Sequence, residues 1–268
     1  MDLTHEKQEN LRRMLRDMGT VAVAFSSGVD STYLLKTAHD VLGDGAIAIT
    51  ASSSIFPKRE NEETRSFCAE EGITQVVLDT DPLEVEGFCE NPKDRCYRCK
   101  RNLFAKIKKI AQDHRRAFVA EGSNLDDEGD YRPGMRAIAE LGIRSPLREV
   151  GLTKREIRVL SKELGLPTWD KPSYACLASR FPYGETITVE KLSMVDRAED
   201  LLLRLGFRQM RVRFHGDVAR IEVEREQLVR IVSPEIAGQI RDYLHELGFL
   251  YVAVDLDGYN TGSLNKKV

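Results

Sequence analysis

The segment from Val21 to Ser31 constrains the fold more than any other part of the sequence. It begins with the continuous apolar run Val21–Phe25, which is typical of a strand buried on both faces. A short turn of small residues follows, and after it apolar positions recur with helical spacing. A buried strand that leads through a tight turn into a helix is the opening of a β-α-β unit. The segment therefore predicts an α/β fold built on a parallel sheet.

The rest of the chain extends this pattern and then departs from it. Apolar runs at 46–50, 73–79 and 117–121 predict three more strands, with helices between them. After about residue 185 the pattern predicts a helix at 189–205, strands at 208–214 and 218–223, another helix, and a strand at 250–255. We therefore expect a parallel-sheet domain over residues 1–185 and a smaller α+β domain over residues 186–268.

One predicted helix has clear signals at both ends. Thr153 and Glu156 have the spacing of a capping box, in which each side chain bonds the other residue's backbone. Gly165 and Pro167 mark the end of the same helix.

Composition and charge exclude several broad classes of protein. The 268 residues are 41% hydrophobic, and 40 basic against 43 acidic residues leave a net charge of −3. A dedicated nucleic-acid binder usually carries a basic excess, which is missing here. No apolar run reaches the roughly 20 residues that cross a bilayer, and the polar N-terminus is unlike a signal peptide. We expect a cytoplasmic protein.

The turn after the first strand, Ser26-Ser27-Gly28-Val29-Asp30-Ser31, has the features of an anion site. Backbone N–H groups at the start of a helix, together with the helix dipole, attract phosphate groups. The two outer serines add hydroxyl donors, and Asp30 is suited either to hold Mg²⁺ or to orient the loop. The segment has no lysine, unlike the GxxxxGK[ST] loop. The alternative is a strand–turn–helix connection whose small residues serve packing alone.

This loop resembles the S-G-G-x-D-S loop of the PP-loop ATP pyrophosphatases, which holds pyrophosphate while AMP passes to a substrate oxygen. Ser27 stands where that family has glycine, and serine is strained if the position needs a positive φ. Glu121–Asp127 resembles the family's G-[ST]-N-x-D-D segment, and Ser145–Arg148 with Leu164–Pro172 resembles its second shared block. The resemblance implies a nucleotide site formed by Ser26, Gly28, Val29, Asp30, Ser31, Gly122, Asn124 and Asp126.

The cysteines indicate a second kind of chemistry. Cys96 and Cys99 form a C-x-x-C pair at the start of a predicted helix, where the helix N-terminus and neighbouring cations stabilise thiolates. With the distant Cys176 they are one ligand short of a closed zinc site. Three thiolates do suit a 4Fe–4S cluster with one open iron. Cys68 and Cys89 are interpreted as packing residues.

Four segments together resemble a single subfamily, and the likeness covers nearly the whole chain. They are D-R-C-Y-R-C-K from Asp94, K-P-S-Y-A-C-L-A-S-R-F-P-Y-G from Lys171, R-V-R-F-H-G-D from Arg211, and D-G-Y-N-T-G-S-L-N from Asp257. The chain is similar to the LarE family of ATP-dependent sulfur transferases, which supply sulfur for the nickel-pincer nucleotide cofactor of lactate racemase.

The resemblance implies a substrate, a reaction and an assembly. ATP adenylylates a carboxylate of pyridinium-3,5-biscarboxylic acid mononucleotide and releases pyrophosphate, and a sulfur nucleophile then displaces AMP. Asp30 and Cys176 would be the catalytic residues. In members with one active cysteine, the residue matching Cys176 gives up its sulfur and becomes dehydroalanine. Cys96, Cys99 and Cys176 match the second type of member, which holds a 4Fe–4S cluster, and we favour it. The family suggests trimers or hexamers.

Three arginines are candidates for binding the phosphate group of such a substrate. Arg211 and Arg213 share one face of a predicted strand, and Arg180 follows the third cysteine. Arginine suits bidentate contacts to phosphate. Ser179, Glu199 and Glu222 match family positions near the same pocket. The alternative for these residues is an exposed, charged face of a strand or helix.

Other classes of function remain open. A tRNA-thiolating PP-loop enzyme would use a similar set of cysteines, but the acidic balance disfavours it. An amide- or nitrile-forming PP-loop enzyme would hold zinc on its C-x-x-C pair. A regulatory module that binds adenine nucleotides would release no pyrophosphate.

Overall fold

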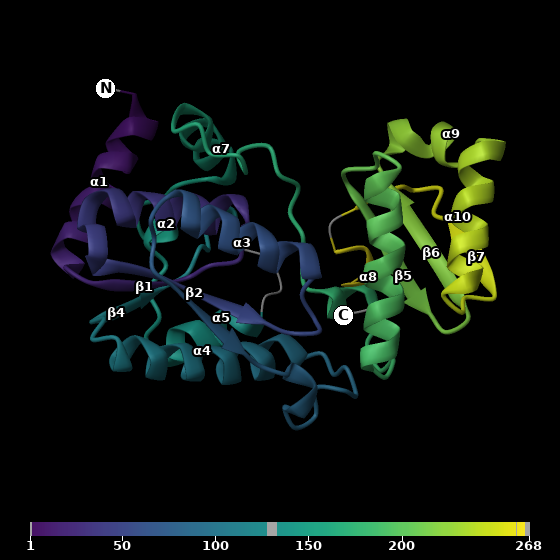
Figure 1. The fold of residues 1–268 in the computed structure, drawn as a ribbon, viewed down its shortest axis with the longest axis horizontal. Helices are drawn as coiled ribbons and strands as arrows, with labels where there is room; N and C mark the ends of the chain where they lie inside the picture. Colours follow the sequence, from purple (N-terminus) through teal and green to yellow (C-terminus); the bar gives the residue numbers. More distant parts are fainter. Residues whose placement is uncertain (1, 128–132, 261, 266–268) are drawn as a thin grey trace. The chain divides into compact units, whose positions relative to one another are not determined.

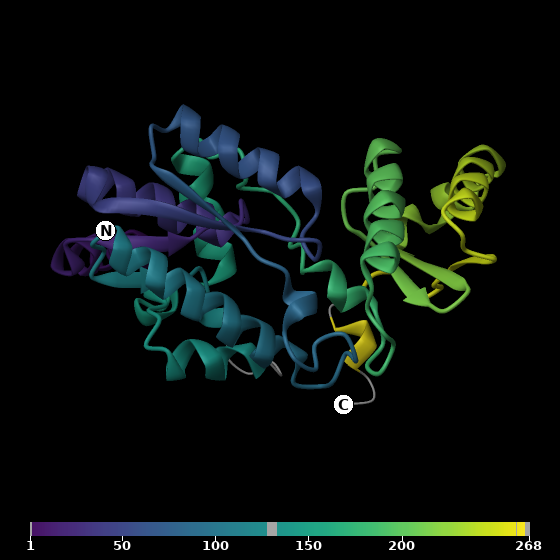
Figure 2. The ribbon, with the colours of Figure 1, turned by 60° about the horizontal axis from the view of Figure 1, so that its bottom comes forward.

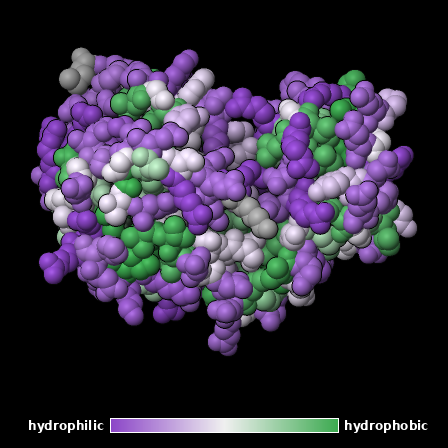
Figure 3. Space-filling view, in the orientation of Figure 1, coloured by the Kyte–Doolittle hydropathy of each residue, from purple (hydrophilic) through white to green (hydrophobic). Residues whose placement is uncertain are grey.

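The computed structural model describes residues 2–127, 133–260 and 262–265, except the side chains of 58 and 265. The chain forms two compact units. Unit 1 comprises Met1–Ser53, Lys58–Asp81 and Cys96–Tyr174, and unit 2 comprises Ser54–Pro57, Pro82–Arg95 and Ala175–Val268. The described helices include none that is long and apolar enough to cross a membrane. Polar residues cover most of the face drawn in Figure 3, and apolar residues gather there in smaller patches.

Unit 1 is built on a parallel four-stranded sheet with the order β3-β2-β1-β4, so the predicted α/β fold is confirmed (Figure 1). The strands are β1 (Val21–Ala24), β2 (Ala46–Ser52), β3 (Gln75–Asp79) and β4 (Phe118–Ala120). In the register, Val21 lies opposite both Ala46 and Phe118. The strand that precedes the candidate phosphate loop is therefore central in the sheet.

Helices cover both faces of this sheet (Figures 1 and 2). One face packs against α1 (Leu3–Met18), α2 (Val29–Leu42), α3 (Lys58–Glu70), α6 (Pro146–Glu149) and α7 (Lys154–Glu163). The other face packs against α4 (Arg95–Asp113) and α5 (Pro133–Glu140).

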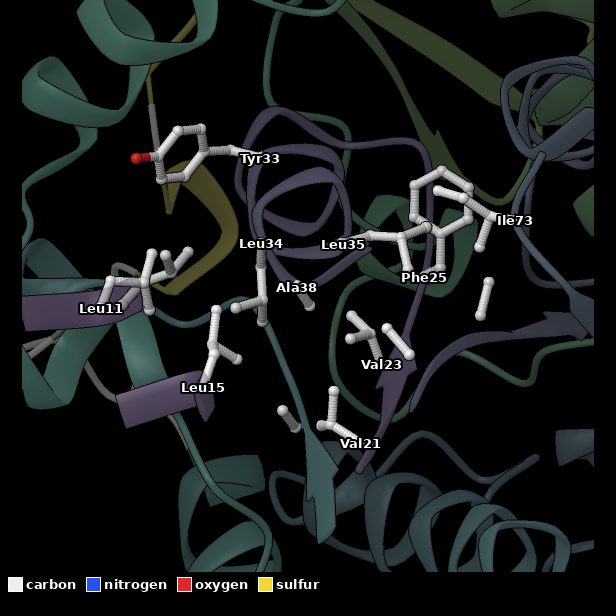
Figure 4. Packing of buried hydrophobic residues seen from close by; sticks show 14 of the residues in the cluster. Leu11, Leu15, Val21, Val23, Phe25, Tyr33, Leu34, Leu35, Ala38 and Ile73 are labelled. Carbon is white, nitrogen blue, oxygen red and sulfur yellow. The ribbon is translucent and has the colours of Figure 1, made fainter. Parts of the chain in front are cut away.

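The side chains of β1 alternate between two buried faces of the sheet, which explains why the strand is apolar throughout. Val21 and Val23 point into the first core, together with Leu11, Leu15 and Leu34 (Figure 4). Ala22, between them, belongs to the second core. A strand with a helix layer on each face cannot alternate apolar with polar residues.

The helix with the predicted capping box begins as expected. Thr153 is the N-cap of α7, its side chain accepts a hydrogen bond from the Glu156 N–H, and Glu156 accepts one from the Thr153 N–H at 2.8 Å. Gly165 follows the helix with a φ of 68°. Both end signals are therefore confirmed.

Unit 2 contains a three-stranded sheet with the order β5-β6-β7. β5 (Met210–His215) and β6 (Val218–Val223) are antiparallel, and β7 (Tyr251–Val254) runs parallel to β6. The helices of this unit are α8 (Val189–Arg204), α9 (Leu228–Ile231) and α10 (Pro234–Glu246). The rings of Phe181 and Phe249 both pack against Phe214, with centroids 5.2 and 5.6 Å away. The element types predicted after residue 185 agree with those found.

Candidate nucleotide and substrate sites

The loop between β1 and α2 leaves the start of the helix open to an anion. Gly28 is the N-cap, its carbonyl accepts from the Thr32 N–H at 2.9 Å, and no described side chain caps the helix. The Ser31 hydroxyl accepts from the Ser26 N–H at 3.3 Å and donates to the Gly28 carbonyl at 3.2 Å. The first amides of a helix have no partner within it, so this loop has the geometry of a phosphate site.

Ser27 adopts the conformation in which serine is strained. Its φ is 51°, in the left-handed region that favours glycine, and its side chain is buried. Ser27 Oγ donates to Glu63 Oε2 at 2.9 Å, and the Lys171 ammonium donates to the Ser27 carbonyl at 3.0 Å. These contacts hold a strained residue in place.

Asp30 lies in the first turn of α2 beside two polar groups from later in the chain. It forms an ion pair with Lys154, and Asn124 Nδ2 donates to it at 3.4 Å. Burial raises the pKa of Asp30, and the Lys154 ammonium group opposes that effect. Sequence reasoning missed Lys154, although the capping box places it at the first position of α7.

The segment after β4 packs directly against the start of α2. A Cβ added at Gly122 would lie only 3.0 Å from Ser31 N and 3.2 Å from Ser31 Cα, so a side chain there would press against the backbone of α2. Asp126 accepts from the Lys154 N–H at 2.8 Å, and it thereby supplies an acceptor to a free amide at the start of α7. Residues 128–130 of this acidic stretch lie outside the described residues. The fold therefore brings the predicted nucleotide-binding residues of this segment close to those of the loop between β1 and α2.

Unit 2 contains a fully buried ion pair between Arg180 and Glu199. Arg180 Nε and Nη2 donate to the two carboxylate oxygens at 2.8 and 2.7 Å. Burial pushes the pKa of Glu199 upward, but the guanidinium group holds it below its usual value. Glu199 also accepts from the Val212 N–H at 3.0 Å. The alternative interpretation, that Glu199 lies on an exposed helix surface, is therefore wrong.

Two further arginines lie beside this pair on β5. Arg213 donates twice to Glu222, at 3.0 and 2.7 Å. Arg211 donates to the Tyr259 hydroxyl at 3.5 Å and lies over its ring, and its pKa is lowered by burial and then by Arg180. Arg211 and Arg213 are only 3% and 5% exposed, so the alternative of a solvated strand face is wrong. Three buried guanidinium groups among two carboxylates suit an anionic ligand.

The cysteines divide between the two units. Cys96 and Cys99 lie half-buried near the start of α4, in unit 1, whereas Cys176 is the half-buried N-cap of a 3₁₀ turn, Leu177–Arg180, in unit 2. Ser179, in that turn, donates its N–H to the Cys176 carbonyl at 2.9 Å. The described residues contain no group of three His, Cys, Asp or Glu arranged to hold a metal ion.

The other two cysteines have local structural contacts. Cys68 is buried in the core of unit 1, and burial raises its pKa to about 12, so its packing role is confirmed. Cys89 is half-buried, and its thiol donates to the Leu83 carbonyl at 3.3 Å.

The parallel sheet and the loop between its central strand and α2 define a nucleotide-binding protein of the PP-loop class. No family model matches the chain. It is 38% identical over 260 residues to the pyridinium-3,5-bisthiocarboxylic acid mononucleotide synthase of Lactiplantibacillus plantarum, an alignment that covers 97% of this chain and 94% of that protein. The chain therefore belongs to the LarE family of enzymes, as its motifs indicated.

Two other relatives agree with this placement. An uncharacterized protein of Synechocystis is 44% identical over 264 residues, which are 98% of each chain. One component of the glutamine-hydrolysing GMP synthase of Methanocaldococcus jannaschii is 26% identical over 178 residues, 60% of this chain and 55% of that one. The first similarity extends over the full length, whereas the second belongs to the wider superfamily.

Proposed function

We propose that this protein is an ATP-dependent sulfurtransferase that converts the carboxylates of pyridinium-3,5-biscarboxylic acid mononucleotide into thiocarboxylates. The observation that carries the proposal is 38% identity over 97% of the chain to a synthase named for the bisthiocarboxylic product. Two candidate anion sites also support it, namely the uncapped start of α2 in unit 1 and the buried arginines of unit 2. The nucleotide made in this way would enter nickel-pincer cofactor synthesis for a lactate racemase.

The first step is adenylylation of a substrate carboxylate. A carboxylate oxygen attacks the α-phosphorus of ATP, the bond to the β-phosphate oxygen breaks, and pyrophosphate leaves. The amides of Gly28, Val29 and Ser31 would hold the phosphates at the start of α2, where backbone donors and the helix dipole favour negative charge. The Asp30 carboxylate, beside those phosphates, is of the ligand type that Mg²⁺ takes. Mg²⁺ would neutralise charge on the departing pyrophosphate.

The remaining predicted nucleotide residues would position this loop. Ser26 contacts Ser31 through its hydroxyl, with the two Oγ atoms 3.2 Å apart. Gly122 permits the close approach to Ser31, and Asn124 contacts Asp30. Asp126 would act through α7, whose first residue it contacts.

We propose that Arg211 and Arg213 bind the phosphate group of the mononucleotide. Glu199 and Glu222 would not bind the phosphate themselves, because a carboxylate repels phosphate. They would instead hold the arginines in place, since both already form ion pairs with guanidinium groups. Arg180 would fix the segment of Cys176, since its Nη1 donates to the carbonyls of Ala175 and Cys176 at 2.7 and 3.2 Å. Ser179 takes part through its hydroxyl, which accepts from Arg180 at 2.9 Å.

The second step transfers sulfur to the acyl adenylate. Cys96, Cys99 and Cys176 supply three thiols, and Cys96 and Cys99 lie near the start of α4. Thiols are the ligand type of a 4Fe–4S cluster, and a cluster held by these three residues would supply an open iron for a sulfide. Alternatively, Cys176 attacks the acyl carbon and AMP leaves. Loss of the cysteine α-proton and cleavage of its Cβ–S bond would then leave dehydroalanine and the thiocarboxylate.

We also propose a division of labour along the chain. Residues 1–185 would activate the substrate, whereas residues 186–268 would bind the mononucleotide and join copies into a trimer or hexamer. Partners would be ATP and the mononucleotide, with no nucleic acid.

Anaerobic purification, followed by iron and sulfide analysis, tests the sulfur source. The protein is then incubated with ATP and the dicarboxylate nucleotide, and AMP, pyrophosphate and the thiocarboxylate product are measured. We expect all three products, and no AMP would overturn the function. Intact mass after turnover decides between the two routes, because loss of the elements of hydrogen sulfide marks sacrifice of Cys176. Tight, strongly salt-dependent tRNA binding would instead favour a tRNA-thiolating enzyme.

A further inference from the structure

The segment D-G-Y-N-T-G-S-L-N, near the C-terminus, folds back within unit 2 onto two arginines of β5. Arg213 Nη2 donates to Ser263 Oγ at 3.0 Å. The Arg211 guanidinium lies over the ring of Tyr259, 5.0 Å from its centroid. We propose that Tyr259 and Ser263 are further binding residues for the phosphate group of the mononucleotide, to which their hydroxyl groups donate beside Arg211 and Arg213. This rests on the proposed function, because it requires the two arginines to bind that phosphate.

The start of this segment is fixed against the end of β6. Gly258 has a φ of 69°, and a Cβ added there would lie only 2.8 Å from the Val223 carbonyl oxygen. A residue without a side chain can therefore make this close approach. Tyr259 then donates its N–H to the same carbonyl at 2.7 Å. Asn260 Nδ2 donates to the carbonyls of Asp257 and Gly258, each at 3.3 Å. These contacts hold the tyrosine ring beside β5.

The hydrogen bonds of Arg213 show why the phosphate needs further donors. Its Nε and Nη2 donate to Glu222, its Nη1 donates to the Ser179 carbonyl, and a second N–H on Nη2 goes to Ser263. Among the described residues, four of the five N–H groups of this guanidinium therefore have acceptors. A phosphate group presents three strong acceptor oxygens. The arginine satisfies only part of them, so neighbouring hydroxyl groups are the natural donors for the rest.

Both hydroxyl groups can turn to a phosphate without leaving a buried group unsatisfied. Ser263 Oγ donates to Glu222 Oε1 at 2.7 Å, and Arg220 Nη1 lies 3.0 Å from the same oxygen. The carboxylate therefore keeps a partner when the serine hydroxyl rotates. The Tyr259 hydroxyl accepts from Arg211 Nη2 at 3.5 Å, and its own proton can point to a phosphate oxygen. Hydroxyl groups also add donors without adding positive charge, which is costly among buried guanidinium groups.

Calorimetric titration with the dicarboxylate mononucleotide and, separately, with its dephosphorylated nucleoside tests the proposal. We expect Ser263→Ala and Tyr259→Phe each to weaken mononucleotide binding about fivefold or more, as loss of a hydrogen bond to a charged group should. Nucleoside binding should not change, because the nucleoside lacks the phosphate. Ser233→Ala and Tyr251→Phe are the matched controls. The first removes a hydroxyl that donates to the Arg230 carbonyl, the second alters a tyrosine of β7 that is 65% exposed, and both should leave mononucleotide binding unchanged.

The same titration in an Arg213→Met background separates direct contact from a positioning role. If Ser263 only holds Arg213 in place, Ser263→Ala has no further effect once the arginine is gone. If the hydroxyl binds the phosphate, the variant still weakens mononucleotide binding. If Arg213→Met does not fold, Tyr259→Phe in an Arg211→Met background gives the equivalent comparison.

Several outcomes would overturn the proposal. They are unchanged mononucleotide affinity in either single variant, equal losses for mononucleotide and nucleoside, and no further loss in the background that lacks the arginine. Tighter binding by Ser263→Ala would also overturn it, because the hydroxyl would then compete with the phosphate for Arg213. Wild-type protein that binds the nucleoside as tightly as the mononucleotide would instead overturn the phosphate site of Arg211 and Arg213 on which the proposal rests.

Discussion

Replacement of Arg180 by methionine should destabilise unit 2 strongly, because it leaves a buried carboxylate without its cation. Both Arg180 and Glu199 are fully buried, and two hydrogen bonds of 2.8 and 2.7 Å join them. Methionine keeps much of the apolar stem of arginine, so packing is largely retained while the charge is lost. The carbonyls of Ala175 and Cys176 also lose a donor.

The expected size of this effect follows from the burial. Removal of one partner from a buried ion pair costs about 3–5 kcal/mol. The double variant Arg180→Met/Glu199→Leu removes both charges of the pair, and replacement of such a pair by apolar residues is often close to neutral. We therefore expect the double variant to be more stable than the single variant by about 2 kcal/mol or more, a non-additive result for residues in contact.

The pH dependence has a definite sign. The folded-state pKa of Glu199 lies below its ordinary value of 4.5, so the ion pair stabilises the fold above that pH. This contribution is lost as the pH falls through the folded-state pKa. In Arg180→Met only burial and weaker partners act on Glu199, so the carboxyl group takes up a proton in the folded state. The difference in stability between wild type and variant should be largest near neutral pH and smaller in acid.

Urea unfolding followed by far-UV circular dichroism measures the free energies of unfolding, and amide exchange of β5 reports on unit 2 alone. The Val212 N–H, which donates to Glu199 Oε1 at 3.0 Å, is the most direct probe. A loss below about 1 kcal/mol for Arg180→Met near neutral pH, well under the expected cost of a broken buried pair, would refute the reasoning. So would a double variant that loses the sum of the two single losses.

Three further outcomes follow from the sites. Gly122→Ala should weaken ATP binding about tenfold or more, because its Cβ would lie 3.0 Å from Ser31 N. The control Gly238→Ala, in α10 with open space around it, should leave ATP binding intact. Calorimetric titration measures the ATP affinity of both variants. Cys176→Ser should abolish thiocarboxylate formation yet retain release of pyrophosphate on adding ATP and the dicarboxylate nucleotide, and loss of both would contradict the assigned step. Arg211→Met should raise the KM for the mononucleotide about tenfold or more with a smaller change in kcat. An equal KM increase for the dephosphorylated nucleoside would rule out a phosphate contact.

Local signals predicted the elements of unit 1 well. The apolar run from Val21 became β1, and the capping box at Thr153 marks the start of α7. The loop of small residues connects β1 to α2, as the sequence predicted. These features depend on residues that are close in the sequence, such as an N-cap and the amide three positions later, so they can be recognised without the fold.

The division into units was harder to see. Segments 54–57 and 82–95 belong to unit 2, although they lie between elements of unit 1 in the sequence. Nothing in their composition marks this membership, because it depends on contacts with residues more than 80 positions away. One such contact is the hydrogen bond of 2.9 Å from Arg95 to the Ala178 carbonyl.

The sequence by itself determined the class of fold, the place of the candidate phosphate loop and the candidate residues for the chemistry. Only the tertiary structure decided which charges meet. Lys154 and Lys171 look like surface lysines in the sequence, yet they pair with Asp30 and Glu63, which are 124 and 108 residues away. Glu199 and Glu222 would be expected in solvent, yet both are fully buried. A charged side chain is stable in the interior only when folding brings its partner to it, and that long-range pairing is not encoded in the local pattern.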